Sequence, residues 1–330
     1  MCMAPQDLPR ETVASACRAC AGPLNDHWQV TDAKSAEPMR LGTCADCSLV
    51  QQLDIPSEEA LHIYYAHHYR QDYKSTHQPR LKHVHRAGGV ALDRLDRMAA
   101  MGVQARGQHL LDIGAGGGEF CFMAQQQGFA VRGIEPHEGY SEFARAHYGV
   151  RIDTCGLADI PAQSADVVTM FHVLEHLANP QQVAEKVWQV LRHRGLWVIE
   201  VPNLLQTDAS PHNIYFKAHL FYYARQSLRA ATSRHFEVLH LHDQGNLFAV
   251  LARRETPLER LQLPTAQELA QVRQQLAAKG WWTYLTVGGG WRRPWQRARR
   301  WLQERQLPST SARDLLEMMH ARPRQTNVRA

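Results

Sequence analysis

His109-Leu-Leu-Asp-Ile-Gly-Ala-Gly-Gly-Gly118 is the stretch that decides the fold. Its apolar residues predict a short strand that ends just after Asp112, and glycines at 114, 116 and 118 predict a tight turn that opens a helix. Glycine has no Cβ, so the backbone of such a turn can bend sharply and approach a ligand at the amino end of the helix. The stretch therefore predicts the nucleotide-binding turn of a Rossmann-like sheet.

The glycine spacing differs from that of dinucleotide-binding proteins. Their fingerprint places glycines at its first, third and sixth positions. Counting from Gly114, the third position is Gly116, but the sixth is Glu119, and the last glycine comes one place early at Gly118. This departure points away from NAD and FAD.

Strand and helix patterns alternate outward from this turn. Strands are predicted at 109–114, 130–135, 151–154, 165–171, 195–201, 236–241 and 246–252, and helices at 118–127, 138–148, 180–192 and 225–234. The helix at 180 has a clear start, because Asn179 suits the N-cap and Pro180 the first helical position. The alternation predicts an α/β fold with a doubly wound, mostly parallel, seven-stranded sheet that binds ligands at the carboxyl ends of its strands.

Two further motifs follow in order along the chain. The second predicted strand ends in Gly-Ile-Glu-Pro, which places Glu135 where a ribose-binding carboxylate is expected. The fourth ends in Met-Phe-His-Val-Leu-Glu-His, residues 170–176. With these motifs, residues 85–253 resemble the class I S-adenosylmethionine-dependent methyltransferases, most closely the large group with a His-Val-Leu-Glu-His signature after the fourth strand.

This resemblance implies where the cofactor S-adenosylmethionine binds. The carboxylate at 112 and the glycine backbone hold its amino-acid end, Glu135 takes the ribose hydroxyls, and residues 157–159 border the adenine. Family members often carry a polar or acidic side chain at that border. The cofactor-binding residues predicted in this way are Asp112, Gly114, Gly116, Gly118, Glu135, Leu157, Ala158, Asp159 and Phe171.

The same resemblance implies an acceptor side after the fourth strand. The candidate catalytic residues there are His172, Glu175, His176 and His219. His176 and His219 match histidines near the acceptor in the sugar C-methyltransferases, which have a Glu-His pair at the second position, whereas this chain has Ala218 before His219. Proton abstraction next to a carbonyl needs a well-oriented base, so the replacement favours O-methylation over C-methylation. Glu175 is expected to orient the loop or the cofactor, and a structural role stays open for each histidine.

Residues 172–176 also fit the His-x-x-Glu-His pattern of inverted zinc peptidases. That pattern belongs on a helix, whereas here it follows a predicted strand inside a cofactor-binding sheet. Peptidase chemistry is therefore the weaker interpretation.

Four of the seven cysteines form two Cys-x-x-Cys pairs, Cys17 with Cys20 and Cys44 with Cys47, which are 23 residues apart. Two knuckles with this spacing predict a zinc ribbon in which four thiolates leave no coordination position for catalysis. The first 50 residues have few large apolar side chains, so we expect a structural Zn²⁺ that supplies folding free energy. A redox role for one pair is the alternative. A ribbon ahead of this core resembles sugar C-methyltransferases and related envelope-polysaccharide enzymes.

These features divide the chain into four predicted parts. They are a zinc-ribbon module at 1–55, a helical lid or linker at 56–105, the methyltransferase domain that binds the cofactor at 106–255, and a helical basic extension at 256–330. The second part is rich in aromatic and ionisable side chains, which suit a substrate lid as well as a solvated linker. These side chains are Tyr64, Tyr65, His67, His68, Tyr69, Asp72, Tyr73 and Lys74.

The C-terminal extension is strongly basic. Residues 291–330 hold ten arginines against three acidic residues, although the whole chain has a formal net charge of only +5. Within 291–302, tryptophans and other apolar side chains recur at helical spacing, with arginines on the other faces. Three interpretations stay open: a helix on a membrane surface, a patch for an anionic substrate or nucleic acid, and a helix docked on the catalytic domain.

Taken together, the sequence predicts an S-adenosylmethionine-dependent methyltransferase acting on a small-molecule or glycan acceptor. The expected acceptor is a sugar hydroxyl in an envelope-glycan or nucleotide-sugar pathway. The alternatives are an RNA methyltransferase, since some combine a zinc ribbon with this fold, and a non-catalytic binding protein. No apolar run approaches the roughly 20 residues of a membrane span, so we expect a cytoplasmic protein, at most peripheral to the inner face of the membrane.

Overall fold

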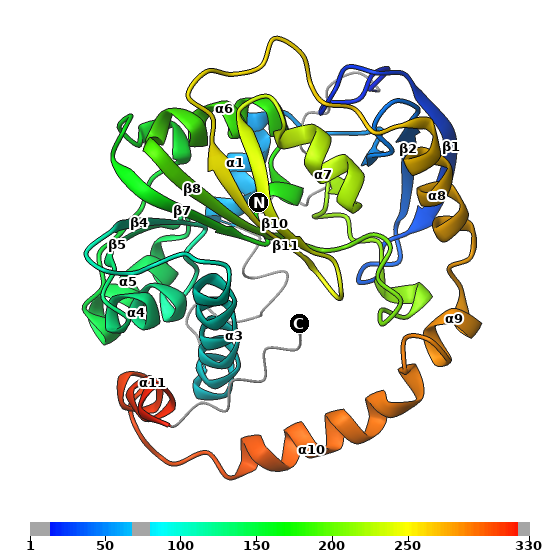
Figure 1. Ribbon diagram of the computed structural model, residues 1–330. Coiled ribbons are helices and arrows are strands. Elements are labelled where there is room, and N and C mark those ends of the chain that lie inside the picture. Colours follow the sequence, from blue (N-terminus) through cyan, green and yellow to red (C-terminus); the bar gives the residue numbers. More distant parts are fainter. Residues whose placement is uncertain (1–13, 68–79, 323–330) are drawn as a thin grey trace. The chain divides into compact units, whose positions relative to one another are not determined.

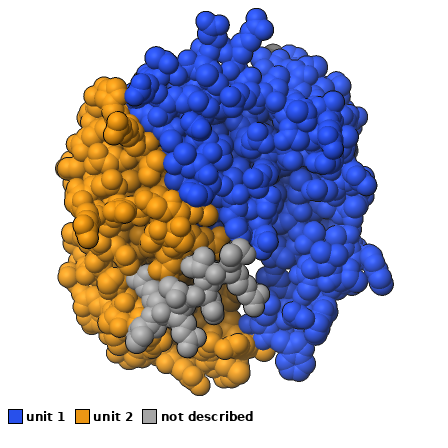
Figure 2. Space-filling model, viewed as in Figure 1, with its two compact units in different colours: residues 1–61, 171–188, 199–297 blue, residues 62–170, 189–198, 298–330 orange. Residues whose placement is uncertain are grey.

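The computed structural model describes residues 14–67 and 80–322 (Figure 1). The chain divides into two compact units, each assembled from separate segments (Figure 2). Unit 1 comprises residues 1–61, 171–188 and 199–297, and unit 2 comprises residues 62–170, 189–198 and 298–330. Segments that are distant in the sequence therefore share one unit.

The larger sheet has seven strands in the order β10-β11-β8-β7-β4-β5-β6. Its strands are β4 (His109–Ile113), β5 (Ala130–Ile134), β6 (Ile152–Asp153), β7 (Ala165–Phe171), β8 (Leu191–Val201), β10 (Phe236–His242) and β11 (Leu247–Arg253). β4 pairs in parallel with β5 and β7, β5 pairs in parallel with β6, and β10 pairs antiparallel with β11. Helices connect the parallel strands, so the predicted Rossmann-like α/β fold is confirmed.

The helices between these strands begin close to the predicted positions. They are α4 (Glu119–Gln126), α5 (Glu138–Tyr148), α6 (Pro180–Val190) and α7 (Arg225–Thr232). At the start of α6 the backbone N–H of Gln182 donates to Oδ1 of Asn179 over 3.2 Å. The predicted N-cap is therefore present, with Pro180 as the first helical residue.

The junction between α6 and β8 differs from the prediction. The helix ends at Val190 instead of 192, and β8 begins at once, four residues earlier than expected. The backbone N–H of Ser164 donates to the carbonyl of Val190 over 2.8 Å, and the Arg192 guanidinium lies 3.0 Å from a carboxylate oxygen of Asp166. Residues 190–192 are therefore bonded to the segment around the start of β7 and do not form the last turn of the predicted helix.

Unit 2 also contains α3 (Leu81–Ala100) and α11 (Ala312–Ala321), which contact each other. Gly88 in α3 permits this contact, because a Cβ there would lie 2.6 Å from a methyl group of Leu316. α11 also contacts α4 and α5, and both Leu315 and Leu316 are buried. The last described helix is therefore docked on the helices of unit 2.

α10 (Arg293–Arg305) has a different surface from α11. Trp295 is 77% exposed and Trp301 is 52% exposed. The guanidinium of Arg305 lies over the ring of Trp301, 3.8 Å from its centroid. Tryptophan and arginine are thus presented together along a helix that leaves its large apolar side chains in solvent.

The smaller sheet belongs to unit 1 and has the order β1-β2-β3-β9. Its strands are β1 (Leu24–Thr31), β2 (Pro38–Cys44), β3 (Val50–Gln52) and β9 (Phe221–Tyr222), all paired antiparallel. β9 was not predicted, and it comes from a distant part of the chain. We call these four strands the ribbon sheet.

The remaining helices are α1 (Glu58–His67), α8 (Ala266–Ala277) and α9 (Trp281–Leu285). α8 begins with a reciprocal cap in which Thr265 and Glu268 bond each other's backbone N–H groups. Of the predicted lid side chains, those of Tyr65 and His67 and those from 68 to 74 lie outside the described part of the structure. Within the described ranges, every helix is too short or too polar to cross a membrane.

Candidate functional site

The glycine turn is fixed to the neighbouring strand of unit 2. The backbone N–H groups of Gly114 and Ala115 both donate to the carbonyl of Ile134, over 2.9 and 3.0 Å. Gly114, Gly116 and Gly118 all have positive φ angles, of 75°, 57° and 84°. Side chains rarely tolerate this backbone conformation, so the predicted glycine positions are required by the turn itself.

Gly118 has a second role in packing. A Cβ at this position would lie 2.6 Å from the Cβ of Ala144 in α5. In the adjacent strand, a Cβ at Gly133 would lie 2.8 Å from the Cβ of Ala115. These two glycines therefore let the turn and the start of α4 sit close against β5 and α5.

Glu135 follows β5 and faces the glycine turn. Its Oε2 accepts the backbone N–H of Gly116 over 2.9 Å, and its Oε1 accepts that of His137 over 3.2 Å. The side chain is buried, with the residue only 4% exposed.

Asp112, the one acidic residue of β4, is buried among polar partners. Its carboxylate accepts the hydroxyl of Thr169 over 2.7 Å and the thiol of Cys121 over 3.5 Å. Burial raises the pKa of Asp112 to about 6, and the bond from Thr169 opposes this rise. These thiol and hydroxyl partners could not be predicted, because they become neighbours of Asp112 only through the pairing of β4 with β7 and the packing of α4.

The predicted adenine border is a single 3-10 turn, Leu157–Asp159. Leu157 is half-buried and Ala158 is exposed. The Asp159 carboxylate accepts the backbone N–H of Gly156 over 3.0 Å, so it stabilises its own turn. Phe171, at the end of β7, is buried in unit 1 and stacks on Phe248, with ring centroids 6.2 Å apart.

The four candidate catalytic residues come together in unit 1, and we call them the imidazole cluster. They are His172, Glu175, His176 and His219. His172 has a positive φ of 56°, and its backbone N–H donates to the carbonyl of Glu200 over 2.8 Å. This uncommon backbone conformation turns the chain sharply after β7 into the 3-10 helix Leu174–His176.

Glu175 is the buried centre of the cluster and is fully inaccessible. Nδ1 of His172 lies 3.4 Å from its Oε1, and Nε2 of His176 lies 3.9 Å from the same oxygen. Within the described part of the chain, neither carboxylate oxygen accepts a hydrogen bond. Burial favours the neutral acid, but the surrounding histidines outweigh it and lower the pKa of Glu175 to about 2.

His176 and His219 pack edge to face, with ring centroids 4.9 Å apart. Nδ1 of His176 lies 2.7 Å from the carbonyl of Ala218. A carbonyl only accepts, so Nδ1 carries the proton of this bond. Burial and the neighbouring His176 lower the pKa of His219 to about 3, so its ring is neutral near pH 7.

Two residues missed by the sequence analysis surround His172. The Asn246 amide lies 3.1 Å from Nε2 of His172 and donates to Oε1 of Glu200 over 2.8 Å. Partial burial disfavours the imidazolium form, yet Glu175 and Glu200 raise the pKa of His172 to about 9. Glu200 lies near the end of β8, and Asn246 lies just before β11. Their position near strand ends was the only feature of the sequence that could have marked them as site residues.

The ribbon sheet holds the segment that carries His219. The side-chain amide of Gln52 donates to the carbonyls of Lys217 and His219, over 2.9 and 2.7 Å. Its backbone N–H donates to the carbonyl of Leu220, whose own N–H donates to the carbonyl of Glu175 over 2.8 Å. Gln52 was also missed, and its only sequence signal was a polar side chain in a strand that is buried throughout.

The four cysteines of the two Cys-x-x-Cys pairs converge in unit 1. The sulfurs of Cys17 and Cys47 are 3.7 Å apart, and those of Cys20 and Cys44 are 3.4 Å apart. All four sulfurs lie within 4.8 Å of one another. Zn–S bonds of about 2.3 Å in a tetrahedron separate the sulfurs by about 3.8 Å, so the donor set fits a zinc ion.

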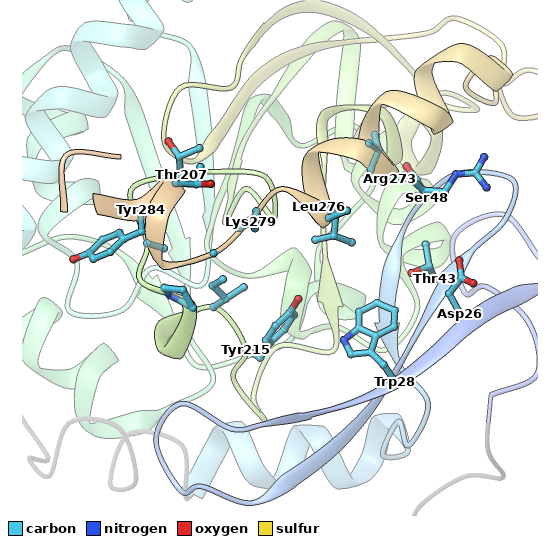
Figure 3. Close-up of a pocket in the computed structure, with 17 residues that line it drawn as sticks. Asp26, Trp28, Thr43, Ser48, Thr207, Tyr215, Arg273, Leu276, Lys279 and Tyr284 are labelled. Carbon is cyan, nitrogen blue, oxygen red and sulfur yellow. The ribbon is translucent and has the colours of Figure 1, made fainter. Parts of the chain in front are cut away.

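Unit 1 also contains a cavity of about 570 Å³ (Figure 3). The rings of Trp28 and Tyr215 line it, together with Leu276 of α8. Lys279 contributes its stem, while its ammonium group donates to the carbonyl of Leu204, and burial lowers the pKa of Lys279 to about 8. The volume suits a small molecule, and the lining is mainly apolar.

Residues 82–241 match a family model described as a methyltransferase domain. The ubiquinone biosynthesis O-methyltransferase of Hahella chejuensis is 34% identical over 110 residues, which cover 31% of this chain and 44% of that protein. The enzyme of the same name from Aromatoleum aromaticum is 31% identical over 148 residues, covering 42% of this chain and 57% of the relative. The chain thus spans about half the length of the curated relatives it matches.

Solved structures of the same class also resemble the chain. An S-adenosylmethionine-dependent methyltransferase from Aquifex aeolicus has 16% sequence identity and a TM-score of 0.43, covering 53% of this chain and 98% of that one. The strand order, the glycine turn and the family match agree with one another. Residues 82–241 are therefore a class I S-adenosylmethionine-dependent methyltransferase domain.

Proposed function

We propose that the protein transfers the methyl group of S-adenosylmethionine to a hydroxyl oxygen. The observation that carries this proposal is the pairing of Glu135 with the glycine turn at the carboxyl ends of β4 and β5. Open α/β sheets bind their ligands at this edge. The names of the curated relatives support transfer to oxygen, as does Ala218 at the position where sugar C-methyltransferases have a glutamate.

The cofactor supplies a methyl group on a positively charged sulfur, which is already a good leaving group. The remaining work is to hold the cofactor, orient the acceptor and accept its proton. The glycine turn and Asp112 are the groups proposed to hold the amino-acid end, and Glu135 is proposed to bind the ribose. The acceptor oxygen forms a bond to the methyl carbon while the carbon–sulfur bond breaks and S-adenosylhomocysteine leaves.

The imidazole cluster is the proposed acceptor side. The cluster begins directly after β7, and open α/β sheets bind their ligands at the carboxyl ends of their strands. The proton on Nδ1 of His176 leaves Nε2 as the basic nitrogen of the neutral ring. His176 and His219 are the residues proposed to take the acceptor's proton.

The acceptor is proposed to be a sugar hydroxyl. The family resemblance and the cavity lined by Trp28 and Tyr215 support a sugar, because such rings suit the apolar faces of a ring-shaped polar molecule. The names of the curated relatives support a second candidate, a hydroxylated intermediate of ubiquinone biosynthesis. Turnover with nucleotide sugars, with glycans and with hydroxylated quinone precursors separates the two acceptor classes.

The four cysteines are proposed to bind a structural Zn²⁺. The sulfur separations support this proposal, as does the exposure of β1, which buries only its first residue. Four thiolates leave no open position, so this ion has no part in the methyl transfer.

Calorimetric titration with S-adenosylhomocysteine tests the cofactor assignment. We expect binding by the full chain, at least tenfold weaker binding by Glu135→Ala, and normal binding by Glu138→Ala, an exposed acidic residue three positions further on. Failure of the folded wild-type chain to bind would reject the methyltransferase proposal.

Substitution of the two histidines tests the acceptor side. We expect His176→Gln and His219→Gln to lose most of their turnover while keeping their affinity for S-adenosylhomocysteine. Replacing the exposed His193 by Gln is the matched control. Undiminished turnover in both variants would remove the imidazole cluster from the mechanism.

A further inference from the structure

We propose that Glu175, His176 and His219 bind a divalent cation, at a site distinct from the four cysteines. The site lies wholly within unit 1. Binding of the ion does not depend on methyl transfer, whereas the use of the ion given below rests on the proposed function.

The first observation is a buried carboxylate whose charge is offset, in the described part of the chain, only by ion pairs with neighbouring histidines. Glu175 is fully inaccessible, and within the described residues both of its oxygens lack a hydrogen bond. A buried carboxylate is costly unless it is paired or coordinates a metal. His172 approaches one oxygen only to 3.4 Å. The carboxylate therefore lies where a cation would offset its burial.

The second observation is the orientation of His176. Its Nδ1 donates to the carbonyl of Ala218 over 2.7 Å, which fixes the ring and its tautomer. Its Nε2 lies on the side of Glu175, 3.9 Å from Oε1. Metal-binding histidines characteristically donate their other ring N–H to a carbonyl or carboxylate, and this bond makes the ligating nitrogen more basic.

The third observation is the convergence of His219 on the same point. One ligand atom from each of Glu175, His176 and His219 lies within 4.8 Å of the others. Ligands of a tetrahedral Zn²⁺ at about 2.0–2.1 Å are about 3.3 Å apart, so the ligand atoms must approach one another by up to about 1.5 Å around an ion. His219 is only half-buried, and rotation of its ring can supply that movement.

The ligand set differs in kind from the cysteine cluster. Two imidazoles and one carboxylate suit Zn²⁺ and neighbouring transition metals, and they leave at least one coordination position open. Four thiolates close a structural site completely. The same chain would therefore hold one ion for folding and another that is accessible to a ligand.

In the proposed reaction, the open position takes the hydroxyl oxygen of the acceptor. A divalent cation lowers the pKa of a bound hydroxyl, so its proton leaves to water. The oxygen then forms its bond to the methyl carbon as the carbon–sulfur bond breaks. His176 and His219 act as ligands in this arrangement, and the ion takes over the task of activating the acceptor.

Metal content of the full chain tests the site. After exposure to excess Zn²⁺ and gel filtration, we expect about two zinc ions per wild-type chain and about one in His219→Gln and Glu175→Gln. The exposed His193→Gln is the control and should keep both ions. Thiol alkylation before and after loading reports separately whether the cysteines are occupied. A wild-type chain with one ion, or a His219→Gln variant that keeps two, would overturn the proposal.

Copper gives a second readout of the ligands. With zinc in the cysteine cluster, Cu²⁺ added to the wild-type chain should show electron paramagnetic resonance couplings from two imidazole nitrogens, and His176→Gln should show one. Titration with S-adenosylhomocysteine on the same samples separates the two proposals. Cofactor binding without a second ion rejects only the metal site, and a second ion without cofactor binding rejects only the methyltransferase function.

Discussion

In the seven-stranded sheet, β4 and β7 are buried along almost their whole length, whereas β1 of the ribbon sheet buries only its first residue. The core of the ribbon sheet combines Leu41 and Val50 with Leu204 and Tyr222, which lie more than 150 residues later in the chain. The large sheet thus forms from apolar strands and local helices. The ribbon sheet takes one strand from a distant part of the chain, and the four clustered cysteines lie in the same unit.

The largest expected effect comes from substituting one of the four clustered cysteines, which should affect the ribbon sheet and spare the seven-stranded sheet. Cys44→Ser should abolish zinc binding and unfold the ribbon sheet, because binding free energies on the order of 10 kcal/mol support such modules. The seven-stranded sheet should stay folded and bind S-adenosylhomocysteine. Metal analysis, limited proteolysis and calorimetry test this, with Cys155→Ser, a half-buried free thiol, as the control. Cooperative loss of both sheets would show that they are not separable.

The second change is a substitution in the core of the seven-stranded sheet. Leu110 in β4 is 1% exposed, so Leu110→Ala should lower the free energy of unfolding by about 3 kcal/mol through lost burial and a cavity. Zinc content should stay the same. Denaturant unfolding measures the loss, and Val90→Ala, at an exposed position in α3, should have little effect. A fall in zinc content would tie the ribbon sheet to this core.

The third change concerns a charge inside the large sheet. The pKa of Asp112 is about 6 in the folded protein and near 3.8 ordinarily, so the folded chain holds its proton more tightly than the unfolded chain. The associated stability is present below pH 3.8 and is lost as the pH rises through 6, at a cost of up to about 3 kcal/mol. Relative to Asp112→Asn, the wild type should therefore become less stable between these pH values. Parallel pH dependence of the two unfolding curves would contradict this.

The smallest expected effect on stability falls on the link from β3 to the imidazole cluster. Gln52→Met keeps the length of the side chain but removes both bonds to the carbonyls of Lys217 and His219, which should cost about 1–2 kcal/mol. Turnover should fall by about tenfold because His219 loses its support, and the affinity for S-adenosylhomocysteine should not change. Gln29→Met, on an exposed position of β1, is the control. Equal loss of cofactor affinity would contradict a role confined to the acceptor side.

Most of the large sheet could be predicted because its signals are local. The strand at 109–113, the glycine turn and the capped helix at 180 each depend on residues that are adjacent in the sequence. The early start of β8 was missed because pairing of the Val190 carbonyl with Ser164 outweighs helix propensity.

The site was predictable in part for the same reason. The residues at 172, 175 and 176 lie within one motif, and the glycines and Glu135 lie at predicted strand ends. Gln52, Glu200 and Asn246 could not be found, since each reaches the cluster only through tertiary pairing. β9 could not be predicted, because a strand of two residues is too short to show an alternation of apolar and polar side chains. The three boundaries between the four predicted parts, and the cofactor and acceptor roles of individual residues, stay predictions.

The position of β9 has a consequence for biosynthesis. The first three strands of the ribbon sheet leave the ribosome early, but β3 meets its partner only after Phe221 and Tyr222 have been made. Until then one edge of β3 is open to pairing with other chains. Contacts of such long sequence separation also form slowly. The nascent chain therefore has an aggregation-prone interval that spans the synthesis of most of the catalytic domain.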